Sequence, residues 1–120
     1  MILLDTNALL WLDSGHRRSR LLAPWSGRLH ISPTSLLELQ FLVESGRLLT
    51  RSPVSEVVDD DRWALDEPPA GAWFEAALGL SWTRDPFDRL LVAHARLRRW
   101  RLATGDRALI EQLGPAALAL

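Results

Sequence analysis

The sequence predicts an α/β protein built on a central parallel sheet. Strand-like and helix-like segments alternate along all 120 residues, as parallel strands joined by crossover helices require. Residues 2–4 are wholly apolar and run directly into Asp5, and short runs of this kind are typical of strands buried on both faces. A similar arrangement returns at residues 102–104, which are followed closely by Asp106.

The first third of the chain predicts two helices and a strand. Residues 8–12 form a short amphipathic helix that Gly15 ends, and residues 17–25 are expected to form a second helix that ends near its proline. Residues 28–31 have the pattern of a short strand.

Two longer helices begin with the same signal. Ser32-Pro33 and Asp85-Pro86 each place a capping side chain directly before a proline, which is a strong helix start. The first of these helices is expected to run to about residue 45, with Gly46 as its terminator, and the second to about residue 99.

The remaining segments are shorter. Residues 51–61 are polar and acidic and predict a solvated helix or loop. The other expected elements are a strand at 63–65, a helix at 72–80, a strand at 102–104, a helix at 107–113 and an edge strand at 116–120.

The composition excludes several classes of function. The chain has no cysteine, so disulfides, zinc–thiolate sites and thiol chemistry are ruled out. All fourteen basic residues are arginine, and without lysine the chain cannot carry a P-loop or a Schiff-base lysine. No apolar run approaches the ~20 residues that cross a bilayer, and no signal peptide is evident. We therefore expect one cytoplasmic domain over residues 1–120, with no membrane association.

Acidic residues recur at positions that meet on one edge of a parallel sheet. Asp5 and Asp106 follow predicted strands. Asp85 and Asp88 open a predicted helix, and Glu38 lies about one turn into another. Ligands bind at this edge of such sheets. Carboxylates gathered there repel one another unless a cation neutralises them, and an oxygen-only set suits Mg²⁺ or Mn²⁺. Such a pocket is typical of in-line phosphodiester hydrolysis.

Each acid also has an ordinary structural alternative. Asp5, Asp85 and Asp106 stand where a side chain can cap a helix N-terminus, and Asp85 with Asp88 resembles a capping box. Glu38 has no capping role in mid-helix, and its alternative is a residue that faces solvent. The repeated placement, rather than any single acid, favours a shared site.

Four motifs, in this order, resemble those of PIN-domain ribonucleases, specifically the VapC-type toxins of type II toxin–antitoxin systems. The first is Leu-Leu-Asp-Thr-Asn-Ala-Leu-Leu-Trp at 3–11. The second is Ser-Pro-Thr-Ser-Leu-Leu-Glu-Leu at 32–39, followed by Gly-Arg-Leu at 46–48. The third, Arg-Asp-Pro-Phe-Asp-Arg-Leu-Leu-Val-Ala at 84–93, is the most specific, and the fourth is Leu-Ala-Thr-Gly-Asp at 102–106. Together they cover nearly the whole chain.

The resemblance implies a three-layer α/β/α sandwich with a central parallel sheet. It also implies Mg²⁺- or Mn²⁺-dependent endoribonuclease activity on an RNA substrate, inhibition by a cognate antitoxin, and usually a homodimer. Residues 52–70 are short and acidic compared with the usual middle region of the family, which leaves the antitoxin surface open.

The motif match also assigns roles to residues. It implies an acidic catalytic site made of Asp5, Glu38, Asp88 and Asp106. Asp5, Asp88 and Asp106 would hold the ion, while Glu38 would hold a second ion or orient the water. Asp85 belongs to the Asp-Pro-Phe-Asp variant of the third motif and would either bind metal or support the ligands. Hydrogen-bonding support is expected from Thr6, Asn7, Ser35 and Thr104.

The arginines fall into two groups. Those that flank the acids are candidates for phosphate contacts, with helix surface pairs as the alternative: Arg84, Arg89 and Arg107. The others cluster at the far end of the helix that begins at Pro86: Arg96, Arg98, Arg99 and Arg101. Arg99 lies on the order of 16 Å from Asp88 at ~1.5 Å per residue, so a solvated face or a partner surface is expected there.

Two rival functions fit parts of the pattern. A catalytically silent PIN-fold interaction scaffold would keep the same pocket for stability, and a test of metal-dependent RNA cleavage separates it from the enzyme. A receiver domain or a haloacid-dehalogenase-like phosphatase would need a lysine, and Asn7 stands where such a phosphatase has its second Asp. The presence of all the motif acids favours the nuclease.

Overall fold

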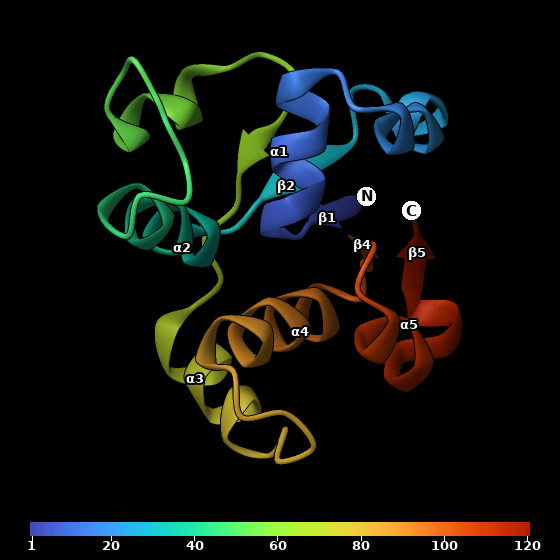
Figure 1. Cartoon of the computed structure of the whole chain (residues 1–120). Coiled ribbons are helices and arrows are strands. Elements are labelled where there is room, and N and C mark those ends of the chain that lie inside the picture. Colours follow the sequence, from blue (N-terminus) through green and yellow to red (C-terminus); the bar gives the residue numbers. More distant parts are fainter.

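In the computed structural model, which describes all 120 residues, a five-stranded sheet runs through the centre of the chain (Figure 1). Its strand order is β3-β2-β1-β4-β5, and every neighbouring pair is parallel. In chain order the strands are β1 Ile2–Leu4, β2 Leu29–Ile31, β3 Ala64–Leu65, β4 Arg101–Thr104 and β5 Ala117–Ala119. The predicted parallel sheet is confirmed.

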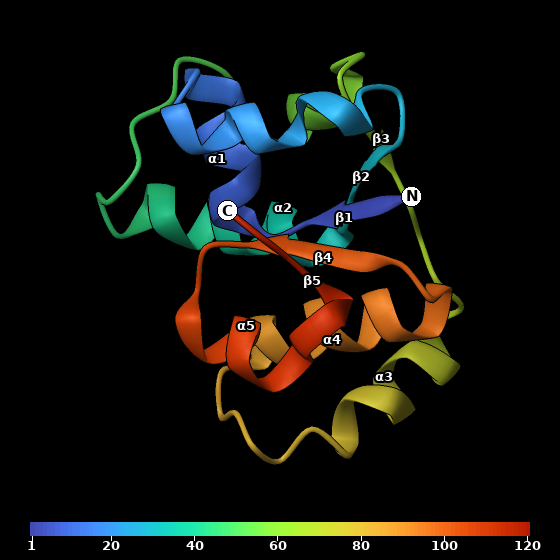
Figure 2. The ribbon, with the colours of Figure 1, turned by 90° about the vertical axis from the view of Figure 1, so that its right-hand side faces the viewer.

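Helices cover both faces of the sheet (Figure 2). One face carries α1 (Thr6–Ser14), the 3₁₀ helix η1 (Arg17–Trp25) and α2 (Pro33–Glu44). The other carries α3 (Ala70–Leu78), α4 (Pro86–Arg98) and α5 (Arg107–Leu113). Two short 3₁₀ helices complete the chain, η2 (Val54–Asp59) and η3 (Gly114–Ala116). This is the three-layer α/β/α arrangement that the resemblance implies.

The central strand explains why there are two separate cores. Side chains alternate across a strand, so Ile2 and Leu4 pack into the cluster beneath α1 and α2, while Leu3 packs into the cluster beneath α3 and α4. All three side chains are fully buried. Strands with two buried faces read as continuous apolar runs, which is the pattern that opens the sequence.

The two predicted proline starts are confirmed. The Ser32 hydroxyl accepts a hydrogen bond from the Thr34 N–H at 3.2 Å, with Pro33 in the first turn. The Asp85 carboxylate accepts from the N–H groups of Phe87 and Asp88 at 2.8 and 3.1 Å. These caps satisfy backbone donors that the first turn leaves free, and they fix where α2 and α4 begin.

The structure differs from the sequence expectations in three places. The second helix, η1, is a 3₁₀ helix, and its Pro24 has no N–H to donate. The helix expected at 72–80 lies two residues earlier, directly after Pro69 and before Gly79. The acidic segment at 51–61 is not wholly solvated, because three valines of η2 pack against the core: Val54, Val57 and Val58.

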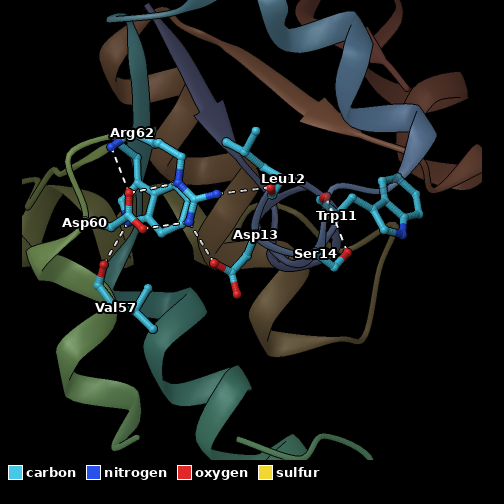
Figure 3. A network of polar contacts seen from close by, with 8 residues as sticks. Trp11, Leu12, Asp13, Ser14, Val57, Asp60 and Arg62 are labelled. Atoms are coloured by element: carbon cyan, nitrogen blue, oxygen red, sulfur yellow. Dashed lines mark hydrogen bonds and ion pairs between the residues drawn. The ribbon is translucent and has the colours of Figure 1, made fainter. Parts of the chain in front are cut away.

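Arg62 ties the segment after η2 to the end of α1 (Figure 3). Its guanidinium donates to both carboxylate oxygens of Asp60 at 2.7–2.9 Å, to the Asp13 carboxylate at 2.7 Å and to the Leu12 carbonyl at 3.2 Å. It also lies over the Trp63 ring, 4.7 Å from the centroid.

None of the helices combines the length and apolarity needed to cross a membrane.

Candidate metal-binding active site

A cavity of about 180 Å³ opens at the edge of the sheet where the strands end and the helices begin. Because all the strands are parallel, their carboxyl ends meet at this edge, and α1, α2 and α5 begin there directly after β1, β2 and β4. The cavity wall contains four of the five acids that the sequence singles out, from four different elements or their caps. The lining residues are Asp5, Thr6, Asn7, Glu38, Leu42, Asp88, Leu91, Asp106 and Leu109.

Asp5 is the most deeply placed acid, with 6% of its surface exposed. Its carboxylate accepts a hydrogen bond from the Ala8 N–H at 2.7 Å, so it caps α1 and lines the cavity at the same time. Burial raises the pKa of Asp5 to about 6, against the lowering effect of hydrogen bonds from Thr104 and Ala8. The nearby carboxylates of Glu38 and Asp106 contribute to this rise.

Glu38 enters the cavity from the second turn of α2 and is partly buried. Its carboxylate accepts a hydrogen bond from the Thr6 hydroxyl, and the Thr6 oxygen lies 3.1 Å from the Ser35 hydroxyl. Burial raises the pKa of Glu38, the bond from Thr6 opposes this, and the charge of Asp85 adds to it. Two of the expected supporting residues therefore hold this acid in the cavity wall.

Asp88 lies in the first turn of α4, and its carboxylate has no hydrogen-bond donor within the chain. Burial raises its pKa to about 7, and four neighbouring carboxylates contribute, in decreasing order Asp85, Asp106, Glu38 and Asp5. An acid whose pKa is raised by four other acids stands in a field of concentrated negative charge.

Asp106 and Asp85 occupy the outer part of the site, and both are exposed. The Asp106 carboxylate accepts from the Leu109 N–H at 3.0 Å and caps α5, and its own N–H donates to the Thr104 hydroxyl at 3.0 Å. Asp85 caps α4 and does not line the cavity, but it is close enough to raise the pKa values of Glu38 and Asp88. Capping and membership of the acidic cluster are therefore compatible.

The other predicted residues are placed as follows. Asn7 lines the cavity, is exposed and makes no side-chain hydrogen bond. None of the three candidate phosphate arginines lines the cavity, and the Arg89 guanidinium donates to the Thr83 carbonyl at 2.7 Å, whereas Arg84 and Arg107 are exposed. At the far end of α4, Arg98 is paired with Asp66 at 2.9 Å.

Sequence reasoning missed the apolar part of the cavity wall. Leu42 follows Glu38 by four residues, and Leu91 and Leu109 follow Asp88 and Asp106 by three. Side chains at these spacings share a helix face, so this signal was present in the sequence. The leucines limit the access of water to the acids and contribute to the burial that raises their pKa values.

Sequence reasoning also missed the support of the loop that carries Asp106. A Cβ atom at Gly105 would lie 2.4 Å from Cη2 of Trp11, so the ring fits only because this residue is glycine. The Trp11 ring in turn stacks on His16 at 5.2 Å and lies 5.1 Å from the Arg18 guanidinium. Side chains of α1 and η1 therefore pack directly against Gly105, the residue before Asp106.

The donor set suits a hard divalent cation. All the polar groups of the cavity are carboxylate, hydroxyl or amide oxygens or nitrogens, with no histidine, and Mg²⁺ and Mn²⁺ prefer oxygen ligands. As the side chains stand, no three acids or histidines are arranged as a ligand set for one ion. The raised pKa values of Asp5 and Asp88 come first from burial and then from the neighbouring carboxylates, whose charge a bound cation would neutralise.

Comparison with known proteins places this geometry in a family. The PIN domain family model matches residues 2–113. None of the curated proteins matches the chain. Among solved structures, a toxin–antitoxin complex from Klebsiella pneumoniae is similar at 17% identity and a TM-score of 0.69, covering 99% of this chain and 97% of that one. VapBC2 from Rickettsia felis, bound to a promoter DNA fragment, is similar at 18% identity and a TM-score of 0.67, with coverages of 100% and 98%.

A third solved structure has the same fold. PAE2754 from Pyrobaculum aerophilum is 20% identical with a TM-score of 0.65, and the alignment covers 98% of this chain and 87% of that one. At these identities the structures show a shared fold. Because the family model spans nearly the whole chain, the protein belongs to the PIN domain family.

Proposed function

We propose that this protein is a Mg²⁺- or Mn²⁺-dependent endoribonuclease and the toxin component of a toxin–antitoxin pair. One observation carries the proposal: four carboxylates from distant parts of the chain line one small cavity, and the pKa values of two of them are raised to about 6 and about 7. Such a cluster is costly in an apoprotein, and a divalent cation offsets that cost.

The proposed roles follow from the position of each acid. Asp5, Asp88 and Asp106 would hold the ion, with Asp85 as a further ligand or a support. A bound divalent cation supplies Lewis-acid stabilisation of the phosphate and a water of lowered pKa. Glu38, fixed by the Thr6 hydroxyl, would hold a second ion or orient the attacking water and accept its proton. Asp5 is fixed by the Ala8 N–H, so its carboxylate is preorganised.

The substrate proposal depends on cations beside the acids. Arg84 and Arg107 are exposed and make no side-chain hydrogen bond within the chain, so both are free to contact RNA phosphates. Arg89 would act only if it released the Thr83 carbonyl. Asn7, exposed on the cavity wall, would contact the scissile region, and Ser35 and Thr104 would support the acids.

The partner proposals are a cognate antitoxin and a second copy of the chain. The similar structure from Klebsiella pneumoniae is a toxin–antitoxin complex, which supports an antitoxin partner for this chain. Large apolar side chains stand exposed on α2 and α3, among them Leu37, Phe41, Phe74 and Leu78 at 52–77% exposure. Exposed apolar surface of this kind fits a homodimer. We place the protein in the cytoplasm, as one domain over residues 1–120.

One observation favours the alternative function, a catalytically silent interaction scaffold. Asp5, Asp85 and Asp106 all cap helices, so they contribute to stability whether or not an ion is bound. Glu38 and Asp88 cap nothing, and a scaffold has no evident use for two further carboxylates in the same cavity. That difference favours the enzyme.

The decisive experiment compares RNA cleavage by the parent with Asp5→Asn and Asp59→Asn. An asparagine can still cap α1, so Asp5→Asn removes the charge and keeps the fold. Asp59 is exposed on η2 and provides a matched control. We expect cleavage by the parent and the control that a chelator stops and Mg²⁺ or Mn²⁺ restores, and none by Asp5→Asn. Cleavage by Asp5→Asn at the parental rate would refute the assignment of Asp5. If the parent does not cleave RNA under any of these conditions, the nuclease proposal is rejected and the catalytically silent scaffold remains.

A further inference from the structure

A second cavity lies at the far end of α4, away from the acidic site. It holds about 280 Å³ between the end of α4, the start of β4 and the region of α5 and η3. Its floor is apolar and includes Val92, Ala95 and Leu113. Three arginines stand in its wall, Arg96, Arg99 and Arg101, and the wall contains no acidic residue. We call this cavity the arginine pocket.

The charge of the arginine pocket is not neutralised within the chain. The only arginines in ion pairs are Arg62 and Arg98, so the three arginines of the pocket have no carboxylate partner. Arg101 donates to the Ala117 carbonyl at 3.1 Å and lies 5.9 Å from the centroid of the Trp25 ring, which packs on the opposite face of the sheet. Arg96 and Arg99 are exposed and are therefore the two charges that a ligand in the pocket would meet.

The backbone holds Arg96 and Arg99 at the pocket. Arg99 ends α4 in the left-handed conformation with a φ of 60°, and its N–H closes the helix on the Ala95 and Arg96 carbonyls. Trp100 follows at once and packs its ring on His30, with 4.5 Å between centroids. Arg101 is the first residue of β4 and is partly buried. The cluster is therefore built on the junction of α4 and β4 rather than on a loose loop.

The chemistry of the wall selects the ligand. Guanidinium groups bind carboxylates through paired hydrogen bonds, and an aliphatic floor favours an apolar group beside them. We propose that the arginine pocket binds an acidic segment of a partner protein, which places one aliphatic or aromatic side chain on the floor and its carboxylates on the arginines. RNA fits less well, because the floor is aliphatic and His30 already covers a face of Trp100.

Binding at the arginine pocket would be independent of the acidic site. Arg96 lies eight residues beyond Asp88 on the same helix, on the order of 12 Å along the axis. A ligand there would leave the catalytic acids open, and variants of the pocket should retain the basal activity of the protein. This separates the proposal from the nuclease assignment, so either can fail alone.

The test uses fluorescence anisotropy with a labelled peptide, Glu-Leu-Glu-Phe-Glu, and its analogue with glutamine at each acidic position. The double variant Arg96→Gln/Arg99→Asn removes two charges from exposed side chains, and asparagine tolerates the left-handed conformation. The matched control Arg47→Gln/Arg51→Gln removes two exposed charges elsewhere. A third variant, Ala116→Phe, fills the pocket and keeps every arginine.

We expect the parent and the control to bind the acidic peptide at least tenfold more tightly than the glutamine analogue. The double variant and Ala116→Phe should both lose at least tenfold in affinity, with unchanged thermal unfolding midpoints. Equal affinity for the two peptides, or equal losses in the pocket and control variants, would overturn the proposal. Tighter binding of a labelled oligouridylate than of the peptide, lost in the double variant, would also overturn it and indicate a nucleic-acid site.

Discussion

Asp88 differs from the other three acids of the cavity because no donor within the chain stabilises its charge. Asp5, Glu38 and Asp106 each accept a hydrogen bond from a neighbouring N–H or hydroxyl. In the absence of a cation, ionised Asp88 is opposed both by burial and by the surrounding carboxylates. The ionised residue therefore lowers stability when no cation is bound, which supports a role in binding one.

This leads to a prediction for Asp88→Asn in metal-free buffer. The pKa of Asp88 is about 7 in the folded state against an ordinary value of 3.8, so the folded state binds its proton more tightly than the unfolded state does. Its ionisation therefore lowers stability progressively as pH rises from about 4 to 7. At pH 8 the variant should be more stable than the parent by about 1–2 kcal/mol, after allowance for solvent screening. Urea unfolding measures the difference.

The pH dependence provides the control for that prediction. Near pH 4 the parental carboxyl is protonated in the folded state, so the two proteins should unfold at nearly the same urea concentration. A stability difference that is the same at pH 4 and pH 8 would show that the amide acts through packing and not through the lost charge. Asp59→Asn, on the surface of η2, should show no such trend.

At the scale of elements, the contact between α1 and the loop after β4 determines where Asp106 lies. Trp11 belongs to α1 and touches Gly105, which directly precedes the acid that caps α5. The sequence contains this glycine, but nothing local indicates that a tryptophan 94 positions earlier presses against it. Contacts of this kind, between elements far apart in the chain, cannot be predicted from local sequence patterns.

We predict that Gly105→Ala lowers both stability and activity. The added Cβ would lie 2.4 Å from Cη2 and 2.8 Å from Cζ3 of the Trp11 ring, so the loop or α1 must move. Overpacking of this kind costs about 1–3 kcal/mol. Thermal unfolding and RNA cleavage should both decline. Gly71→Ala, on α3 with open space around it, is the matched control and should not lose stability.

A second variant separates the contact from a general effect of alanine in the loop. Trp11→Leu removes the ring that the new Cβ meets, so Gly105→Ala should cost less in that background than in the parent. Additive losses in the double variant would contradict the proposed contact.

The Arg62 network makes a prediction for the attachment of η2 and β3. The Arg62 side chain joins Asp60, Asp13 and the Leu12 carbonyl and covers Trp63, although it is partly exposed. Arg62→Ala should lower the free energy of unfolding by about 1–2 kcal/mol, because several weak contacts are lost together. Arg47→Ala, an exposed arginine without such bonds, serves as the reference. Equal unfolding free energies for the two variants would mean that the network contributes nothing.

At the scale of the whole molecule, local rules predicted most of the element order. The sequence predicted the all-apolar first strand and the two helix starts with a capping residue and a proline, because these features depend on residues close together in the chain. Element boundaries were less predictable where two signals competed, as at α3, where Pro69 sets the start two residues early. The valines of η2 escaped notice because the surrounding acids suggested a solvated segment.

The candidate site was predictable for a different reason. A parallel sheet brings its strand ends to one edge, and α1, α2 and α5 begin there directly after β1, β2 and β4, so the positions of acids in the sequence imply their proximity in space. Glu38, Asp88 and the two strand-end acids follow that rule. The sequence indicates an arginine cluster at the far end of α4, but the cavity beside it could not be predicted, because its floor combines residues of α4 and α5 that only tertiary packing brings together.

The central claim is that a divalent cation makes this acidic cluster tolerable, and anomalous diffraction from crystals soaked in Mn²⁺ tests it most directly. We predict a Mn²⁺ peak bounded by Asp5, Asp88 and Asp106, with Glu38 turned toward it, and no such peak in crystals of Asp5→Asn. A parental cavity that stays without a peak at millimolar Mn²⁺, with the four carboxylates still apart, would contradict the account.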